Sequence, residues 1–237
     1  MLPLRPAESE LEEQAFLFIK SNRKVVIKKF ANPDVYTSVV TPVSLFMAGS
    51  PGAGKTEVSR GLVKRFKDAP VRIDADEIRT LCPEYTGTNA HVFQKAANKG
   101  VNILFDYVLD KNINCVLDST FAYAGAMDNI KRSLEHKRIV EVWFVYQDPI
   151  KAWELTKARE LREARHVSKA VFVEAFFQAK ENARRVKNEF GDQVELNLLI
   201  KDYDKGTEEF KLNINSDQLD QFTADGYSEQ NLLDALI

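Results

Sequence analysis

One glycine-rich segment constrains the fold of this chain more than any other feature. Residues 49–56 read Gly-Ser-Pro-Gly-Ala-Gly-Lys-Thr, which matches the pattern GxxxxGK[ST]. An apolar run of strand length, 43–48, precedes it, and a helix-compatible stretch, 57–66, follows it. A phosphate-binding loop needs this context, because glycines let consecutive backbone N–H groups turn toward one anion at the N-terminus of a helix. The segment predicts nucleotide binding; the alternative is a glycine-rich turn that happens to precede a lysine.

The residue types in this segment suggest individual roles. Lys55 is predicted to reach the β- and γ-phosphates, and the Thr56 hydroxyl to complete the coordination of Mg²⁺. ATP and Mg²⁺ are therefore the expected cofactors. The predicted nucleotide contacts of the loop are Gly49, Ser50, Pro51, Gly52, Ala53, Gly54, Lys55 and Thr56. No NKxD-type base-reading segment is present, which argues against a GTPase, and the chain is short for a remodelling ATPase with a second helical domain.

Strand-like and helix-like segments alternate along the chain. Short β-branched or aromatic runs, typical of strands covered on both faces, lie at 43–48, 71–74, 115–118, 140–146, 196–200 and 210–214. Helix-compatible segments lie at 55–67, 90–110, 124–136, 150–165 and 169–190, the last with Ser168 as N-cap and Gly191 past its end. This alternation predicts right-handed crossovers and a three-layer α/β fold with a mostly parallel sheet.

Composition divides the chain into three parts. Residues 1–41 are predicted to form an N-terminal helical extension, with a helix that starts at a Ser9 N-cap and runs to Lys20. Residues 42–215 form the α/β domain, and residues 216–237 an acidic C-terminal helical segment.

Net charge and apolar runs exclude several classes of function. The 237 residues hold 33 Lys and Arg against 35 Asp and Glu, a formal charge of −2. Duplex nucleic acid is bound mainly by cations that neutralise several phosphates, so nucleic acid is not the expected partner. Two cysteines make no disulfide framework, no apolar run could span a bilayer, and the first residues lack the apolar stretch of a signal peptide. We expect a cytoplasmic protein without membrane contact.

Carboxylates follow two of the predicted strands. Asp76 comes just after the strand at 71–74, and ligands of open α/β sheets bind beyond the carboxyl ends of the strands. Phosphoryl transfer needs a carboxylate that orients and deprotonates the attacking hydroxyl, so Asp76 is the predicted base, with Arg79 near it at the acceptor. Asp74 is the weaker candidate. The alternative is that Asp76 only caps the helix that follows.

Asp118 ends the strand at 115–118 and is followed closely by Thr120. Asp118 is predicted either to hold a Mg²⁺-bound water or to bind the acceptor, and Thr120 supplies a nearby hydroxyl for that acceptor. The alternative is that the two residues form a turn or cap pair.

A cluster of cations lies in the predicted helix at 150–165 and just after it. Residues 157–169 contain two acids, Glu160 and Glu163, and five cations, which gives a local charge of +3. The cations are Lys157, Arg159, Arg162, Arg165 and Lys169. The three arginines are spaced by three residues and share one broad face of a helix. This spacing favours a lid that presents guanidinium groups to phosphates, because the planar fork of arginine binds phosphate in bidentate fashion. Solvated surface charge is the alternative for each of them.

Together, these motifs resemble the zeta toxin family, over roughly residues 42–190. The likeness rests on AGSPGAGKT (48–56), IDADEIR with the CPEY segment (73–85), LDST (117–120), and KARELR with ARHVSK (157–169). The resemblance implies a P-loop kinase-like fold and the use of ATP and Mg²⁺ to phosphorylate the 3′-hydroxyl of the amino sugar of UDP-N-acetylglucosamine. A protein antitoxin is the partner that it implies.

The resemblance also implies roles for single residues. Lys55 corresponds to the phosphate-binding lysine, Asp76 to the catalytic base, and Arg159 and Arg165 to two arginines that contact the γ-phosphate. Asp118 falls where the family more usually has a glutamate. The segment between the two arginines is shorter, and the chain before the loop longer, than in the best-known toxins.

Two other functions are compatible with the sequence. One is another P-loop kinase that acts on a small molecule or on a polynucleotide 5′ end. The other is a nucleotide-binding regulatory module without turnover, in which Asp76 only caps a helix.

Overall fold

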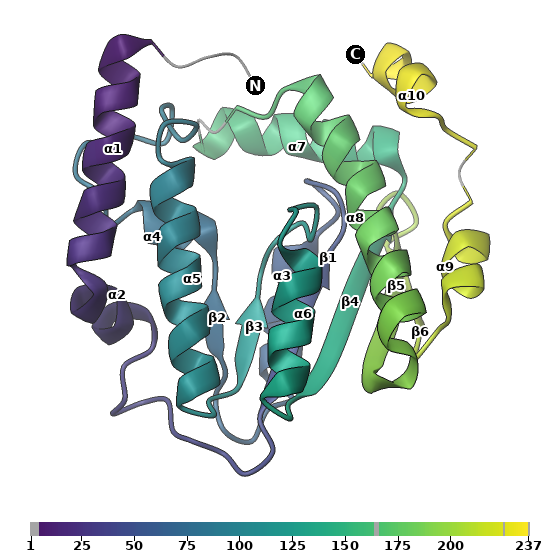
Figure 1. Cartoon of the computed structure of the whole chain (residues 1–237). Coiled ribbons are helices and arrows are strands. Elements are labelled where there is room, and N and C mark those ends of the chain that lie inside the picture. Colours follow the sequence, from purple (N-terminus) through teal and green to yellow (C-terminus); the bar gives the residue numbers. More distant parts are fainter. Residues whose placement is uncertain (1–4, 164–165, 225, 237) are drawn as a thin grey trace.

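Six strands form one sheet in the order β2-β3-β1-β4-β5-β6 (Figure 1). The computed structural model describes residues 5–163, 166–224 and 226–236, and of residues 162 and 163 it describes the backbone alone. The strands are β1 (Val43–Ala48), β2 (Val71–Ile73), β3 (Cys115–Leu117), β4 (Ile139–Gln147), β5 (Val194–Asp202) and β6 (Thr207–Lys211). Strands β1 to β5 run parallel, and β6 pairs antiparallel with β5. The mostly parallel sheet predicted from the sequence is confirmed.

Helices cover both faces of this sheet. They are α1 (Pro6–Ser21), α2 (Arg23–Phe30), α3 (Lys55–Val63), α4 (Ala75–Arg79), α5 (Gln94–Asp110), α6 (Ala126–Glu135), α7 (Pro149–Glu163), α8 (Lys169–Phe190), α9 (Ser216–Phe222) and α10 (Glu229–Ala235), with a 3₁₀ turn at Gly191–Gln193. In β1, Phe46 belongs to a large apolar cluster with residues of α5, α6 and α8, whereas its neighbours Leu45 and Met47 pack with α3. Alternate side chains of a strand point to opposite faces, so this central strand is buried on both sides.

The register of the sheet brings the loops of the predicted site together. Leu117 of β3 is paired with Phe46 of β1 on one side and with Ile73 of β2 on the other. Because the strands are parallel, all three end on the same side of the sheet: the chain leaves it after Ile73 and Leu117, and β1 continues two residues further, to Ala48. Asp118 and Asp74 directly follow paired residues, and the Asp118 N–H donates to the Ile73 carbonyl at 2.9 Å.

The terminal helices lie on opposite sides of the molecule (Figure 1). Helices α1 and α2 pack against α5, and Ile19 and Val26 are fully buried in the large cluster. Gly100 allows α5 to approach α4, because a Cβ at this position would lie 2.5 Å from the Ile78 side chain. Helices α9 and α10 pack against α8 instead. The short helix α4, which carries Asp76, is thus backed by α5.

Several expected boundaries differ in the structure: the helix expected at 55–67 ends at Val63, and the helix expected at 90–110 begins at Gln94. Two further differences have a visible local cause. Helix α1 begins at Pro6 with Arg5 at its N-cap position, so Ser9 lies inside the first turn and is not the cap. The last strand was expected at 210–214, but β6 covers Thr207–Lys211, because pairing with β5 begins immediately after a tight turn and Asn213 has a positive φ of 45°. Helix α8 starts and ends as predicted, with the Ser168 hydroxyl accepting from the Val171 N–H. None of the helices in the described residues combines the length and apolarity needed to cross a membrane.

Candidate active site

The predicted phosphate-binding loop joins β1 to α3 and is tightly enclosed. Gly49, Gly52 and Gly54 all have positive φ values, of 130°, 74° and 86°, which L-residues with side chains rarely adopt. A Cβ on Gly49 would lie 2.3 Å from the Val145 carbonyl oxygen of β4, and a Cβ on Gly52 would lie 2.0 Å from the Ala152 carbonyl oxygen of α7. Gly49 and Gly52 are therefore required both by their backbone conformation and by the close approach of β4 and α7, and Gly54 by its backbone conformation.

Lys55 is the first residue of α3 and folds back over the loop. Its Nζ donates to the carbonyl oxygens of Gly49 at 2.9 Å and Ser50 at 2.7 Å. The side chain is half-buried, and Thr56 follows it in the first turn of the helix. The loop thus combines a lysine ammonium with the N-terminus of a nine-residue helix, which is the electrostatic setting that favours a bound phosphate.

Asp118 lies beside this loop with a side chain that is only 4% exposed. Its Oδ2 accepts from the Ser59 hydroxyl of α3 at 2.8 Å and from the Arg72 guanidinium of β2, at 3.1 Å from Nε and 2.7 Å from Nη2. Within the described part of the chain, its Oδ1 makes no hydrogen bond. Asp118 is therefore held through one oxygen, and the other stays available as an acceptor.

The donor set around the loop suits Mg²⁺. Among the described residues, no group of three or more His, Cys, Asp or Glu side chains could hold a metal ion. Mg²⁺ usually keeps several waters and takes only one or two protein ligands together with the phosphates of its nucleotide. The Thr56 hydroxyl and the Asp118 carboxylate meet that requirement, so both remain the predicted metal-binding residues.

Asp76 lies in the first turn of α4, and its side chain is 31% exposed. The N-cap of this helix is Asp74, whose Oδ1 accepts from the Asp76 N–H at 2.8 Å. The alternative reading of Asp76 as the cap is therefore wrong, because the helix begins at Ala75, one residue before it. The Asp76 side chain is partly exposed and pairs with Arg79.

Arg79 was predicted to lie at the acceptor, but its side chain is only 3% exposed. Its Nη1 pairs with Asp76 Oδ1 at 2.5 Å, and its Nη2 donates to the Gln94 side chain of α5. The structure therefore places Arg79 behind Asp76, where it fixes the orientation of that carboxylate. Gln94 supports this pair from α5, which the sequence did not indicate.

Burial makes Asp74 hard to ionise. Its side chain is 15% exposed, and burial together with the nearby Asp76 charge raises its pKa to about 6, although the positive charge of Arg72 opposes the shift. An acid whose pKa is higher in the folded than in the unfolded chain destabilises the fold as the pH rises, because the unfolded state loses its proton first.

Replacing Asp74 with asparagine is expected to stabilise the protein in a pH-dependent way. The gain in the free energy of unfolding should be absent near pH 3.5, grow as the pH rises to about 6, and reach at most about 3 kcal/mol above that. The amide oxygen of asparagine can still accept the hydrogen bond that caps α4. Urea unfolding of both proteins at several pH values measures the difference. A difference that does not change with pH would contradict the raised pKa.

Thr120 lies close to the phosphate-binding loop. Its carbonyl oxygen accepts from the Gly49 N–H at 3.1 Å, and its hydroxyl accepts from the Ala122 N–H at 3.4 Å in a short turn. The predicted contact of its hydroxyl with an acceptor stays a prediction.

The cations of α7 are only partly described. Arg159 lies at an exposed position of α7. Lys157 pairs with Glu160 at 2.5 Å, which neutralises part of the charge in this stretch, and the His166 ring also contacts Glu160 at 2.5 Å. The Arg162 side chain and the whole of Arg165 lie outside the described residues. Their predicted roles toward the phosphates stay predictions.

A second lysine borders the loop from β5 and gave no signal in the sequence. Lys201 Nζ pairs with Glu57 of α3 at 3.0 Å and with Glu208 of β6 at 3.2 Å. It lies 2.9 Å from the point that a Cβ on Gly54 would occupy. Burial alone would lower the pKa of the Lys201 ammonium, but its hydrogen bonds to the two glutamates raise it. These contacts depend on the strand order and cannot be read from local sequence.

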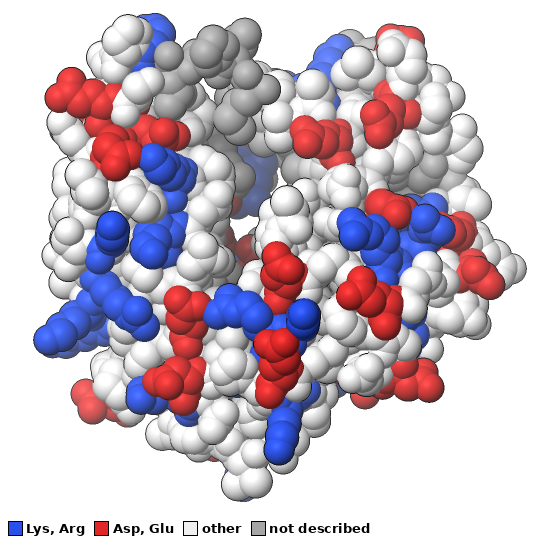
Figure 2. Space-filling model, in the orientation of Figure 1, with Lys and Arg blue, Asp and Glu red and all other residues white. Residues whose placement is uncertain are grey.

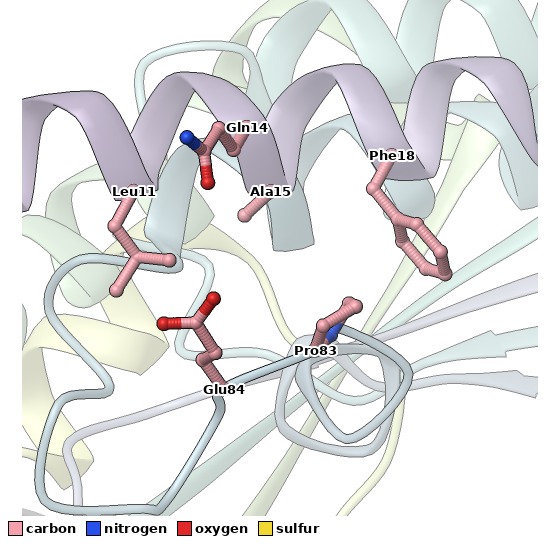
Figure 3. A pocket seen from close by; sticks show the side chains of 6 residues that line it. All are labelled: Leu11, Gln14, Ala15, Phe18, Pro83 and Glu84. Carbon is pink, nitrogen blue, oxygen red and sulfur yellow. The ribbon is translucent and has the colours of Figure 1, made fainter.

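The surface is hollowed between the α4–α5 side and the α7–α8 side of the molecule (Figure 2). Basic residues and acidic residues both lie deep in this hollow, above the ends of the central strands (Figures 1 and 2). A separate cavity lies between α1 and the loop after α4, lined by Leu11, Gln14, Ala15, Phe18, Pro83 and Glu84 (Figure 3). None of the predicted site residues lines that second cavity.

Comparison with protein families identifies the chain. The family model described as zeta toxin matches residues 29–214, well over half of the sequence. The chain belongs to the zeta toxin family. Zeta toxins are nucleotide-binding proteins of the P-loop kinase type, which agrees with the glycine-rich loop between β1 and α3. The family match begins within α2 and ends just after β6.

Solved structures share the zeta toxin fold at low sequence identity. One comes from the PezAT chromosomal toxin-antitoxin system of Streptococcus pneumoniae, with a TM-score of 0.67 and 15% identity, over 99% of this chain and 95% of the other. Another is the complex of AvrRxo1-ORF1 with AvrRxo1-ORF2 and sulphate ions, with a TM-score of 0.61 and 15% identity, over 94% and 75% of the two chains. A search of curated proteins gives no match.

Proposed function

We propose that this member of the zeta toxin family is a kinase that transfers the γ-phosphate of ATP to a hydroxyl group of a small metabolite. The observation that carries the proposal is the convergence of three groups at one edge of the sheet. These are the phosphate-binding loop with Lys55, the buried carboxylate Asp118 and the partly exposed carboxylate Asp76 with its arginine partner. The first acceptor to test is the 3′-hydroxyl of the amino sugar in UDP-N-acetylglucosamine, which the family resemblance implies.

The phosphate-binding loop and Lys55 are proposed to bind the phosphates of ATP. Backbone N–H groups of residues 49–56 and the Lys55 ammonium would neutralise the phosphates of ATP. Thr56 and Asp118 would hold Mg²⁺, which supplies further neutralisation of the charge that develops on the transferred group. Arg159 on α7 is proposed, with Arg162 and Arg165, to bring further positive charge to the phosphates. These residues belong to the segment predicted to form a lid.

Asp76 is proposed to act as the general base. The Arg79 ion pair holds one oxygen of the carboxylate, and the 31% exposure of the side chain leaves room for a hydroxyl to approach. The acceptor oxygen forms a bond to the γ-phosphorus, the bond between that phosphorus and the bridging oxygen of ADP breaks, and the hydroxyl proton passes to Asp76. Thr120 is proposed to hydrogen-bond the acceptor. Arg79 acts on the reaction through Asp76.

A protein antitoxin is the proposed partner. The structural relatives come from a toxin-antitoxin system and from a two-protein complex. The system and the complex are those of the related proteins and not of this chain. Copurification of this chain with the product of a neighbouring gene is therefore the direct test of an antitoxin partner.

A screen of a cell metabolite pool tests the activity without presuming the acceptor. The pool is incubated with ATP, Mg²⁺ and either the wild-type protein or Lys55→Ala, and mass spectrometry follows any species that gains the mass of one phosphate. We expect one phosphorylated nucleotide sugar with the wild type and none with the variant. Phosphorylation of an oligonucleotide 5′ end in a parallel reaction would favour the polynucleotide kinase alternative, and ATP binding without any product would favour a regulatory module.

A further inference from the structure

Arg72 of β2 bridges three carboxylates near the carboxyl ends of the parallel strands, where the site lies. Its Nη2 lies 2.6 Å from Asp74 Oδ2 and 2.7 Å from Asp118 Oδ2, and its Nη1 pairs with Glu77 of α4. Its Nε gives Asp118 a second bond at 3.1 Å. The Arg72 side chain is only 18% exposed. One guanidinium therefore connects β2, the end of β3 and α4.

The register of the sheet fixes this arrangement. Arg72 and Asp74 are two positions apart on an extended segment and point to the same side of it. Asp118 directly follows Leu117, the partner of Ile73 across the β2–β3 pair. Arg72 therefore has both aspartates within reach through ordinary strand geometry, and the five N–H donors of its planar fork can serve all three carboxylates.

Asp118 depends on Arg72 more than the other two carboxylates do. Its side chain is 4% exposed, and besides Arg72 the only described donor to it is the Ser59 hydroxyl. A nearly buried carboxylate that loses its cation must take up a proton, rotate toward water or destabilise the fold. Protonation would remove the charge of the carboxylate that Asp118 presents beside the phosphate-binding loop, and rotation or local unfolding would move its oxygens.

We propose that Arg72 is a positioning residue that ties the metal side of the site, through Asp118, to the helix that carries the base, through Asp74. The inference rests on the proposed function. Within the described residues, the hydrogen bonds and ion pairs of Arg72 all go to carboxylates, and its proposed role is to fix one carboxylate beside the loop and the cap of α4. A lysine at this position would keep the charge but could not reach all three carboxylates, so Arg72→Lys should restore only part of the function.

The test compares Arg72→Met and Arg72→Lys with the wild type and with Arg132→Met. The last variant is the matched control, because Arg132 pairs with Asp106 between α6 and α5 and contacts none of the site carboxylates. With UDP-N-acetylglucosamine or the acceptor found by the screen, kcat/KM should fall about 10- to 100-fold in Arg72→Met and less in Arg72→Lys, with no change in the control. The Mg²⁺ concentration for half-maximal activity should rise about tenfold in Arg72→Met, an effect that simple loss of folded protein cannot produce.

Ser59→Ala keeps the test decisive if Arg72→Met does not fold. It removes the other donor to Asp118 and leaves all charges in place, so it should raise the Mg²⁺ requirement in the same direction. An active wild-type enzyme whose Arg72 and Ser59 variants keep the wild-type Mg²⁺ dependence would overturn the inference.

Binding of a fluorescent ATP analogue at increasing Mg²⁺ concentrations separates this inference from the proposed function. If the wild type binds the analogue but phosphorylates no acceptor, the proposed function fails. The role of Arg72 is then read from binding alone. A raised Mg²⁺ requirement for binding in Arg72→Lys supports it, and an unchanged requirement overturns it.

Discussion

Replacing Asp76 with asparagine is expected to lower kcat about a thousandfold and to leave the affinity for ATP and Mg²⁺ close to that of the wild type. The amide keeps the size of the side chain but cannot take the proton of the attacking hydroxyl. Asp74 caps α4 and Arg79 is anchored to Gln94, so the helix should keep its place. Phosphate transfer measured at saturating ATP, together with calorimetric binding of ATP and Mg²⁺, reports the two quantities separately.

Asp128→Asn is the matched control for this experiment. Asp128 also lies in the first turn of a helix, α6, but it is exposed and is not one of the proposed site residues. Its replacement should leave kcat unchanged. If Asp76→Asn turns over as fast as the wild type, Asp76 is not the base, and the regulatory alternative gains support when the wild type itself makes no product.

Lys55→Ala is expected to lower kcat/KM for ATP at least about a hundredfold, because a preorganised cation beside the phosphates is lost. The same change should abolish the thermal stabilisation by ATP, which for the wild type amounts to about 2.7 kcal/mol at a hundredfold excess over Kd. Differential scanning calorimetry with and without ATP and Mg²⁺ measures this linkage and needs no acceptor.

The ligand-free comparison is essential for Lys55, because its ammonium also bonds the carbonyls of Gly49 and Ser50. Loss of these two bonds should cost about 1–2 kcal/mol of stability without nucleotide. Lys64→Ala, at the exposed C-terminal end of the same helix, removes an equal charge far from the loop and should behave as the wild type in both respects. An ATP-dependent stabilisation that survives in Lys55→Ala would contradict the assignment of the loop.

Much of this site follows from the sequence because parallel strands end at one edge. Residues after β1, β2 and β3 were expected on one side of a parallel sheet, and Lys55, Asp74 and Asp118 follow these strands. That the three strands are neighbours is given by the strand order of the structure. Helix α8 was also predictable to the residue, because a serine cap, a regular apolar spacing and a terminal glycine all agree on its limits.

The remaining contacts depend on information that the local sequence does not carry. Whether Asp74 or Asp76 caps α4 depends on a shift of two residues in the start of a five-residue helix. The pairing of Arg72 with Asp118 needs the register of β2 against β3, and the position of Lys201 needs the approach of β5 to the loop. The hydrogen bond of Arg79 to Gln94 likewise needs the packing of α4 against α5, which the local sequence does not give.

The close contacts of Gly49 with β4 and of Gly52 with α7 have a consequence for affinity. A flexible loop loses conformational entropy when it closes around a phosphate, and that loss weakens binding. Here β4 and α7 lie so close to Gly49 and Gly52 that they restrict the backbone of the loop. Most of the favourable interaction with a phosphate can therefore contribute directly to affinity, and association should require little rearrangement of the loop.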